Sequence, residues 1–305
     1  MLGPNSSGGL VYPVGHRIKM KHGYLDTLCD TSLGSGTART LKSFGYEWTA
    51  FDQVRAEDEG FADNYFHDLD FDSLAGKVAL DAGCGKGRYT RFIAPHAEAL
   101  VALDGSSAVE AAARTLQQFP NVLVVKADLL RIPFARESFD FISCLGVLHH
   151  LEDPHRGFEQ LVEYLAPEGL ILLYLYSRPP RFGTRAAGLA VADMLRRVTV
   201  KMPHRVLRVI GAPLAVALYA GIVLPGRLGE ERARRHLADL PLATYRRQPV
   251  RSLWLDTFDR LSAPIEHRYR WSDLEWWFTQ AKLEVQSVRH EAGWFILARK
   301  RLVAG

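Results

Sequence analysis

The sequence predicts an α/β fold, built as a doubly wound and mostly parallel sheet. Three apolar runs of strand length occupy residues 78–80, 99–103 and 122–125, and segments of helical periodicity separate them. Runs without alternating polar residues are typical of strands buried on both faces, which is the environment of a parallel sheet covered by helices. The first two runs end in Asp81 and Asp104, so polar groups are expected at one edge of the sheet.

A glycine-rich loop follows the first strand. Gly83, Gly85 and Gly87 lie at alternate positions. They come directly after Asp81, and a helix is predicted over residues 88–93. Glycine is needed where the backbone approaches a ligand more closely than any Cβ allows. The loop therefore indicates a nucleotide-cofactor site, with a glycine turn that only packs helix on strand as the alternative.

Acidic residues follow successive strands. Asp104 lies 23 positions after Asp81, the spacing at which a βαβ unit places a carboxylate beside a ribose. Asp128 follows the third strand, and residues 139–144 are predicted as a fourth. Ligands bind at the carboxyl ends of such strands. A dinucleotide is disfavoured, because its fingerprint requires a third glycine where this chain has Arg88.

A resemblance to a known family rests on four successive features. They are the segment Asp-Ala-Gly-Cys-Gly-Lys-Gly at residues 81–87, then Asp104, Asp128 and residues 139–154. Over roughly residues 76–176 they resemble the motifs of class I S-adenosylmethionine-dependent methyltransferases. The resemblance implies a Rossmann-like fold with a seven-stranded sheet, a C-terminal antiparallel hairpin and S-adenosylmethionine as cofactor.

Within that class, residues 146–154 are similar to the ubiquinone/menaquinone type of small-molecule methyltransferase. By this resemblance, backbone around Gly83 and Leu145 holds the methionine moiety, Asp104 the ribose and Asp128 the adenine amino group. The family commonly has an apolar residue where this chain has Gly105, so the adenine wall is expected from Leu103, Leu129 or elsewhere. The full cofactor-binding set expected is Asp81, Gly83, Gly85, Gly87, Asp104, Gly105, Asp128, Leu129 and Leu145.

Candidate catalytic residues follow the fourth strand. Transfer of an activated methyl group mainly requires positioning of the nucleophile, but an acidifiable hydroxyl, amine or carbon also needs a base. His149 and His150 lie at the substrate edge, and imidazole titrates near neutral pH, so one of them is the candidate base. The alternative is that both are structural. Candidate substrate contacts, which packing or a solvated turn would also explain, are Tyr174, Tyr176, His267 and Arg268.

Four regions are expected. Residues 1–75 form an N-terminal arm whose aromatic residues cover the cofactor as a lid or only pack on the domain, and residues 76–176 form the cofactor-binding core. Residues 177–270, inserted after the fifth strand, form a helical basic substrate cap. Residues 271–305 supply a helix and a hairpin that complete the sheet, with Ser272 and Glu275 as a capping box at the start of that helix.

The insertion differs from the rest of the chain in charge. Residues 181–247 hold twelve arginines, one lysine and four acids, a net charge of +9 in a chain whose total is +4, which favours an anionic partner. Inside it, residues 209–224 carry no charge but are shorter than the roughly 18 residues that span a bilayer. Three interpretations of this run remain open. It forms a buried helix, a wall of an apolar pocket, or an interfacial helix with Arg205, Arg208 and Arg227 at its ends.

Composition agrees with a cytoplasmic enzyme. The chain has 305 residues and 48% hydrophobic content, and no signal peptide is expected in residues 1–9. Cys29, Cys84 and Cys144 are too far apart for a zinc or iron–sulfur site, so buried thiols and no metal are expected.

The predicted function is methyl transfer by in-line displacement to a small or lipid-like acceptor, with an anionic group on the acceptor and peripheral membrane contact as open options. The alternatives are an RNA methyltransferase, which the lack of a recognised RNA-binding module disfavours, and a cofactor-binding scaffold without activity. The acceptor, the atom methylated and the oligomeric state are not predicted.

Overall fold

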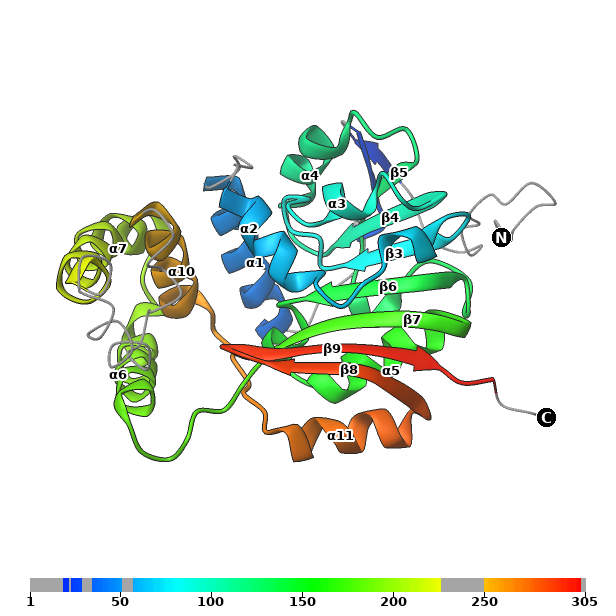
Figure 1. Cartoon of the computed structure of the whole chain (residues 1–305). Helices are drawn as coiled ribbons and strands as arrows, with labels where there is room; N and C mark the ends of the chain where they lie inside the picture. The colour runs from blue at the N-terminus through cyan, green and yellow to red at the C-terminus, as the bar shows by residue number, and fades with distance from the viewer. Residues whose placement is uncertain (1–18, 22, 29–34, 51–56, 226–249, 303–305) are drawn as a thin grey trace. The chain divides into compact units, whose positions relative to one another are not determined.

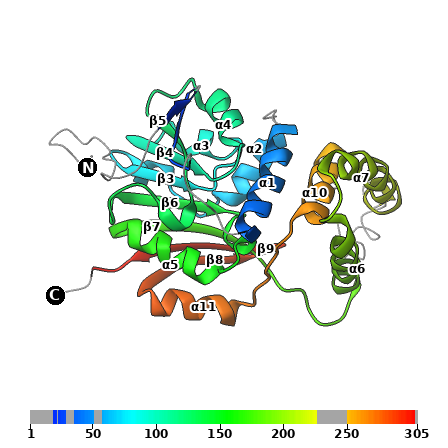
Figure 2. The ribbon, with the colours of Figure 1, turned by 180° about the vertical axis from the view of Figure 1, so that it is seen from behind.

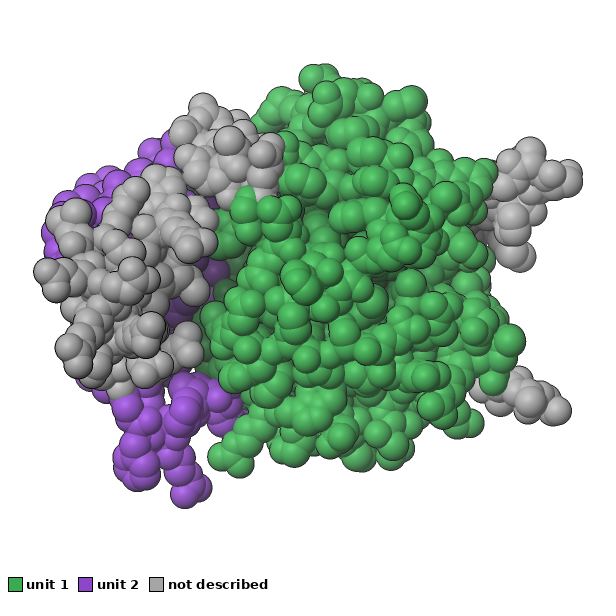
Figure 3. All heavy atoms as spheres, in the orientation of Figure 1, with its two compact units in different colours: residues 1–177, 265–305 green, residues 178–264 purple. Residues whose placement is uncertain are grey.

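The computed structural model of the chain describes residues 19–21, 23–28, 35–50, 57–225 and 250–302 (Figure 1). Two compact units are distinguished (Figure 3): unit 1 is Met1–Ser177 with Ile265–Gly305, and unit 2 is Arg178–Pro264. Residues 265–270, assigned to the insertion by the sequence analysis, thus belong to unit 1. Cys29 and Arg227 lie outside the described residues.

Unit 1 is built on one sheet with the strand order β1-β2-β5-β4-β3-β6-β7-β9-β8 in the described part of the chain. Strands β2 to β7 pair in parallel, whereas β7–β9 and β8–β9 are antiparallel (Figures 1 and 2). The strands are β1 (Lys19–Lys21), β2 (Tyr24–Asp26), β3 (Val78–Ala82), β4 (Ala99–Asp104), β5 (Val122–Lys126), β6 (Phe139–Leu145), β7 (Leu165–Tyr176), β8 (Leu283–His290) and β9 (Gly293–Lys300).

The predicted fold class is confirmed. Seven strands, from β5 to β8 in the order above, form the mostly parallel sheet with its C-terminal antiparallel hairpin. The strands β1 and β2 extend this sheet beyond β5 and were not predicted. Each has three residues, which is too short for a period of two to stand out in the sequence.

Helices cover both faces of the sheet. Leu80 of β3 belongs to a core with Phe158 of α5 (Pro154–Tyr164) and Phe278 of α11 (Trp271–Gln280). Its neighbour Ala79 belongs to a core on the opposite side with Ile93 of α3. Successive strand residues are therefore buried on alternate faces. The remaining helices of unit 1 are α1 (Ser35–Ala50), α2 (Glu57–Tyr65), α3 (Thr90–Ile93) and α4 (Val109–Leu116), with short turns η1 (Phe71–Leu74), η2 (Leu129–Arg131) and η3 (Leu148–His150).

Two predicted helix starts are wrong. The helix after the glycine loop, α3, begins at Thr90 rather than Arg88 because the turn extends to Gly87, whose φ of +79° is left-handed. At α11 the backbone N–H of Arg270 donates to Oδ2 of Asp273 at 2.9 Å. The capping box is thus formed by Arg270 and Asp273, two residues earlier than the predicted Ser272 and Glu275 pair.

Unit 2 consists of helices in its described part. These are α6 (Thr184–Thr199), α7 (His204–Leu218), which continues into the π-helical turn η4 (Tyr219–Val223), and α10 (Val250–Ser262). Helix α10 joins the other two: Thr199 donates its hydroxyl to the carbonyl of Leu261 at 2.7 Å, and Trp254 donates Nε1–H to the carbonyl of Arg208 at 3.1 Å.

The apolar run at residues 209–224 forms most of α7 and η4. One side of it is buried, at Gly211, Ala215 and Val223. Among the described helices, none combines the length and the apolar character needed to cross a membrane.

Candidate active site

The glycine loop adopts a conformation that requires glycine. Gly83, Gly85 and Gly87 have φ values of +88°, +54° and +79°, where a side chain is strained. A Cβ on Gly83 would also lie 2.3 Å from the side chain of Val147, which follows β6. The cofactor loop and the turn that carries the candidate histidines are therefore in direct contact.

Asp104 fixes the loop from the end of β4. Its Oδ2 accepts the N–H of Gly85 at 2.9 Å, and its Oδ1 accepts the N–H of Ser106 at 2.8 Å. An ionised carboxylate offers about four acceptor positions, so two further hydrogen bonds remain possible. This partly exposed carboxylate fits the two hydroxyl groups of a ribose.

The carboxylate of Asp81, unlike that of Asp104, is not exposed to a ligand. It is buried, and it accepts hydrogen bonds from the hydroxyl groups of Thr90 at 2.5 Å and Ser143 at 2.8 Å. Burial raises the pKa of this carboxyl to about 6, against the lowering effect of both hydrogen bonds. Because both oxygens bind protein groups, Asp81 connects β3, α3 and β6 beneath the loop.

The remaining cofactor candidates lie at neighbouring strand ends. Asp128 caps η2, since its Oδ1 accepts the N–H of Leu130 at 3.0 Å, and Leu129 beside it is buried. Leu145 ends β6 and is partly buried.

Leu41 lies beside Gly105, the position at which the family commonly has an apolar side chain. A Cβ on Gly105 would lie 3.0 Å from the side chain of Leu41 in α1. Leu41, which the sequence analysis missed, therefore lies beside Gly105, where the apolar wall of the adenine site is predicted. No local pattern connects residues 41 and 105, so the sequence offered no signal for this pair.

Helix α1 lies beside the carboxyl ends of the parallel strands (Figure 1). Trp48 approaches the loop, at 3.3 Å from where a Cβ of Gly85 would be. Two cations of the loop region, Lys86 and Arg88, lie 5.5 and 5.7 Å from the ring centroid of Trp48, within the range of cation–π attraction. One turn earlier on the same side of α1, the ring of Phe44 is 4.8 Å from that of His150. The predicted aromatic arm thus covers the edge where the loop and the histidines meet.

His149 is a buried neutral imidazole. Burial lowers its pKa well below the usual 6.5, and the neighbouring His150, Arg268 and His267 lower it further. Its ring stacks on Tyr176 at 3.9 Å between centroids, and neither ring nitrogen has a hydrogen-bond partner among the described residues.

His150 is held by the backbone. Its Nδ1 lies 2.7 Å from the carbonyl oxygen of Ile265. A carbonyl can only accept, so Nδ1 carries the proton of the neutral ring and the lone pair is on Nε2. This is the tautomer in which Nε2 can receive a proton from another group.

Residues 265–270, which precede α11, contact the histidines that follow β6. The N–H of His267 donates to the carbonyl of His149 at 2.8 Å, and Nε2 of His267 is buried without a partner in the described chain. Arg268 forms a short ion pair with Glu266 and lies 5.1 Å from the ring centroid of Tyr176. The structure therefore brings together four of the predicted residues, His149, Tyr176, His267 and Arg268, and His150 lies beside them.

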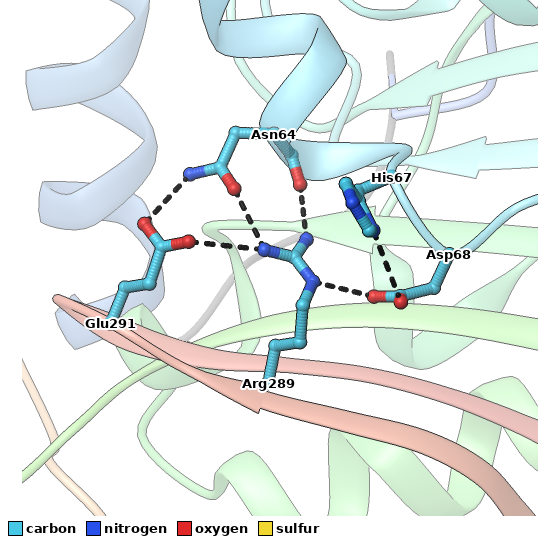
Figure 4. Close-up of polar contacts among 5 residues, drawn as sticks. All are labelled: Asn64, His67, Asp68, Arg289 and Glu291. Carbon is cyan, nitrogen blue, oxygen red and sulfur yellow. Dashed lines mark hydrogen bonds and ion pairs between the residues drawn. The ribbon is translucent and has the colours of Figure 1, made fainter.

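Tyr174 reaches this group through Tyr176, at 5.9 Å between ring centroids, and it also lies 4.9 Å from Tyr65 of α2. A polar network fixes α2 to the terminal hairpin (Figure 4). Arg289 of β8 donates to Asp68 at 2.7 Å and to the side chain of Asn64 at 2.8 Å, and it also binds the Asn64 carbonyl and Glu291. The sequence analysis missed this network.

No group of three or more histidine, cysteine or acidic side chains suited to a metal occurs within the described ranges. The thiols of Cys84 and Cys144 are free and buried.

Comparison with known proteins supports this geometry. A family model described as a methyltransferase domain matches residues 80–173, which contain the glycine loop, Asp104 and both histidines. Unit 1 contains a class I S-adenosylmethionine-dependent methyltransferase domain.

Relatives of the methyltransferase domain include quinone-pathway enzymes. The chain is 32% identical over 108 residues to the demethylmenaquinone methyltransferase of Clavibacter sepedonicus, covering 35% of this chain and 44% of that protein. It is 31% identical over 111 residues to the ubiquinone biosynthesis O-methyltransferase of Pseudomonas paraeruginosa, covering 35% and 48%. The matches thus span less than half the length of either relative.

A solved structure of an S-adenosylmethionine-dependent methyltransferase from Mesorhizobium loti aligns with a TM-score of 0.48 at 16% identity, over 79% of this chain and 99% of that one.

Proposed function

We propose that the whole chain transfers the methyl group of S-adenosylmethionine to a small or lipid-like acceptor, with His150 as the base. The observation that carries this proposal is the fixed tautomer of His150, whose Nδ1 donates to the Ile265 carbonyl. The ring lies three residues after Val147, which touches Gly83 of the cofactor loop.

The cofactor, when bound, supplies a methyl group that is already activated by the sulfonium centre. The residues present fit it: the left-handed glycines leave room for a ligand at the loop backbone, and Asp104 retains acceptor capacity for the ribose hydroxyls. Leu41, Leu103 and Leu129 provide apolar surface for the adenine.

The chain contributes positioning and proton removal. Nε2 of His150 takes the proton of an acceptor hydroxyl or amine while the acceptor is held in line, and positioning of this kind supplies about 7–11 kcal/mol of a barrier. His149 stays neutral because of its burial, so it orients the acceptor by hydrogen bonding and does not compete for the proton. Tyr174, Tyr176, His267 and Arg268 line the acceptor side in this proposal.

The acceptor itself is proposed to join an apolar body to a polar or anionic group. Quinone-type relatives and the basic, partly apolar insertion support this reading. The cytoplasmic location expected from composition stays a prediction. RNA as acceptor is the weaker candidate, since the sequence contains no recognised RNA-binding module.

The test is a coupled assay that measures S-adenosylhomocysteine release with a panel of neutral, anionic and lipid-linked acceptors bearing a free hydroxyl or amine. Release with at least one such acceptor, and none with RNA, is expected. Release only with RNA, or with no acceptor, would contradict the proposal.

Asp104→Ala tests the cofactor assignment separately. Binding of S-adenosylhomocysteine, measured by calorimetry, should weaken by about 1.5–3 kcal/mol, the range for hydrogen bonds to a charged group. The exposed Asp72→Ala is the matched control and should bind like the wild type. Equal affinity of Asp104→Ala and wild type would mean that another carboxylate holds the ribose.

A further inference from the structure

Helix α6 exposes an apolar face. Val191, Met194, Leu195 and Val198 follow the spacing i, i+3, i+4 and i+7 and lie on one side of the helix. They are between 41% and 60% exposed. The other side faces α10, where Arg196 donates to the carbonyl of Arg260 at 2.9 Å. An apolar stripe of α6 therefore lies in water, whereas such a stripe usually faces the inside of a protein.

Helix α7 repeats this arrangement. Its buried side contains Leu207, Gly211 and Ala215, and the indole of Trp254 lies against Gly211. Its outer side carries four aliphatic residues that are 45–70% exposed: Val206, Val209, Ile210 and Val216. Single exposed apolar residues are ordinary, but eight on two helices of one small unit indicate a binding surface.

Charge identifies the kind of partner. The sequence contains no acidic residue between Asp193 and Glu230, a stretch that includes all of the exposed face of α7 and the last three apolar residues of the α6 face. Three exposed cations, Arg197, Lys201 and Arg205, lie where α6 ends and α7 begins. Aliphatic side chains flanked by exposed cations are typical of helices that lie on an anionic bilayer, because the apolar face enters the acyl boundary while the cations meet lipid phosphates.

RNA or a second protein would each account for only one of the two features of this surface, its cations or its aliphatic residues. RNA would use the cations but would leave the aliphatic residues in water. A second protein surface would cover the aliphatic residues without needing an acid-free stretch. Neither α6 nor α7 is long and apolar enough to cross a membrane, so a surface contact is the geometry that remains.

We propose that the exposed faces of α6 and α7 bind the surface of an anionic lipid membrane. Each helix lies in the plane of the interface, with its aliphatic residues at the acyl boundary. This inference rests on unit 2 alone and is independent of the reaction proposed for unit 1.

The experiment is flotation of the full chain with vesicles of phosphatidylcholine mixed with phosphatidylglycerol, and with vesicles of phosphatidylcholine alone. The wild type should float with the anionic vesicles, less so at high salt, and should bind neutral vesicles weakly. The double variant Val191→Asp/Val209→Asp should lower binding by roughly tenfold or more, because it places charge in each apolar face. The matched control is Val288→Asp, an exposed valine of β8 in unit 1, which should bind like the wild type.

Charge reversals test the same surface without touching its apolar residues. Arg197→Glu and Lys201→Glu should each lower binding to anionic vesicles by roughly fivefold or more. Helicity by circular dichroism and S-adenosylhomocysteine binding, both unchanged, would show that each variant folds. The proposal would be overturned if the double variant bound like the wild type, if the wild type bound neutral and anionic vesicles equally, or if the wild type bound no vesicles. Self-association or RNA binding at these faces would then identify the partner instead.

Discussion

Two adjacent histidines differ because their surroundings differ. His150 is hydrogen-bonded through Nδ1 to a backbone carbonyl, which leaves its Nε2 as the basic atom. His149 is stacked on Tyr176 and kept neutral by burial. The same side chain therefore suits proton transfer at one position and neutral recognition at the next.

Removing the proposed base should affect turnover and not cofactor binding. His150→Ala should lower kcat by about 10²–10⁴, the usual contribution of a general base, while the affinity for S-adenosylhomocysteine stays close to wild type. Steady-state kinetics and calorimetry measure the two quantities. The control is His290→Ala, because His290 stacks on Trp294 in the hairpin. Near-normal turnover of His150→Ala across pH would assign this residue to structure.

Asp81 makes stability depend on pH. Its pKa is about 6 in the fold against 3.8 in the unfolded chain, so the folded state binds the proton more tightly. The contribution of Asp81 to stability should therefore fall by about 3 kcal/mol in all as pH rises from about 4 to 6. Asp81→Asn has no such proton and should lack this fall. Denaturant titrations at pH 4, 5, 6 and 7 compare the two, and parallel curves would contradict the burial argument.

At the scale of elements, α1 and α2 reach the strand ends from outside the sheet. Helix α1 contacts the glycine loop, the turn after β4 and His150. Helix α2 is fixed to β8 through Arg289 (Figure 4). Tyr65 of α2 lies beside Tyr174. The two helices therefore depend on different contacts, and each can be tested alone.

Arg289→Met should remove the contact between α2 and the hairpin. We expect unfolding free energy to fall by about 1.5–3 kcal/mol, since hydrogen bonds to a charged group are lost and Asp68 stays partly buried. The control is Arg301→Met, whose pair with Glu284 is exposed and should contribute at most about 1 kcal/mol.

The ion pair between Arg289 and Asp68 has a defined pH dependence. Burial acts to raise the pKa of Asp68, but the hydrogen bond and charge of Arg289 outweigh it and lower the pKa below 3.8. The stabilisation is thus complete above pH 3.8 and is lost as pH falls through the lower folded value. The difference between wild type and Arg289→Met should shrink in strong acid. An equal difference at pH 7 and in strong acid would exclude the ion pair as its cause.

At the scale of the molecule, the two units need not unfold together. The cofactor candidates lie in unit 1, so ligand should stabilise that unit directly. S-adenosylhomocysteine at 100 times its dissociation constant should stabilise unit 1 by about 2.7 kcal/mol. Scanning calorimetry should show one transition moving upward with ligand while any separate transition of unit 2 stays in place. A scan in which no transition moves would rule out the cofactor site.

Local patterns in the sequence were enough to predict seven strands of the sheet, the glycine loop and the positions of the strand-end acids. Apolar runs, their spacing and alternate glycines are local patterns, and a parallel βαβ connection brings the ends of successive strands to one edge. For that reason the fold class, the methyltransferase domain and the position of Asp104 at the loop were predictable.

Features that depend on residues far apart in the chain became visible only once the chain was folded. The tautomer of His150 depends on a carbonyl 115 residues away, and Arg289 meets Asn64 across 225 residues. Leu41 supplies the apolar neighbour that Gly105 lacks. The exposed faces of α6 and α7 also could not be predicted, because an apolar stripe in a sequence is the same whether it faces a core or solvent, and only packing around α10 distinguishes the two.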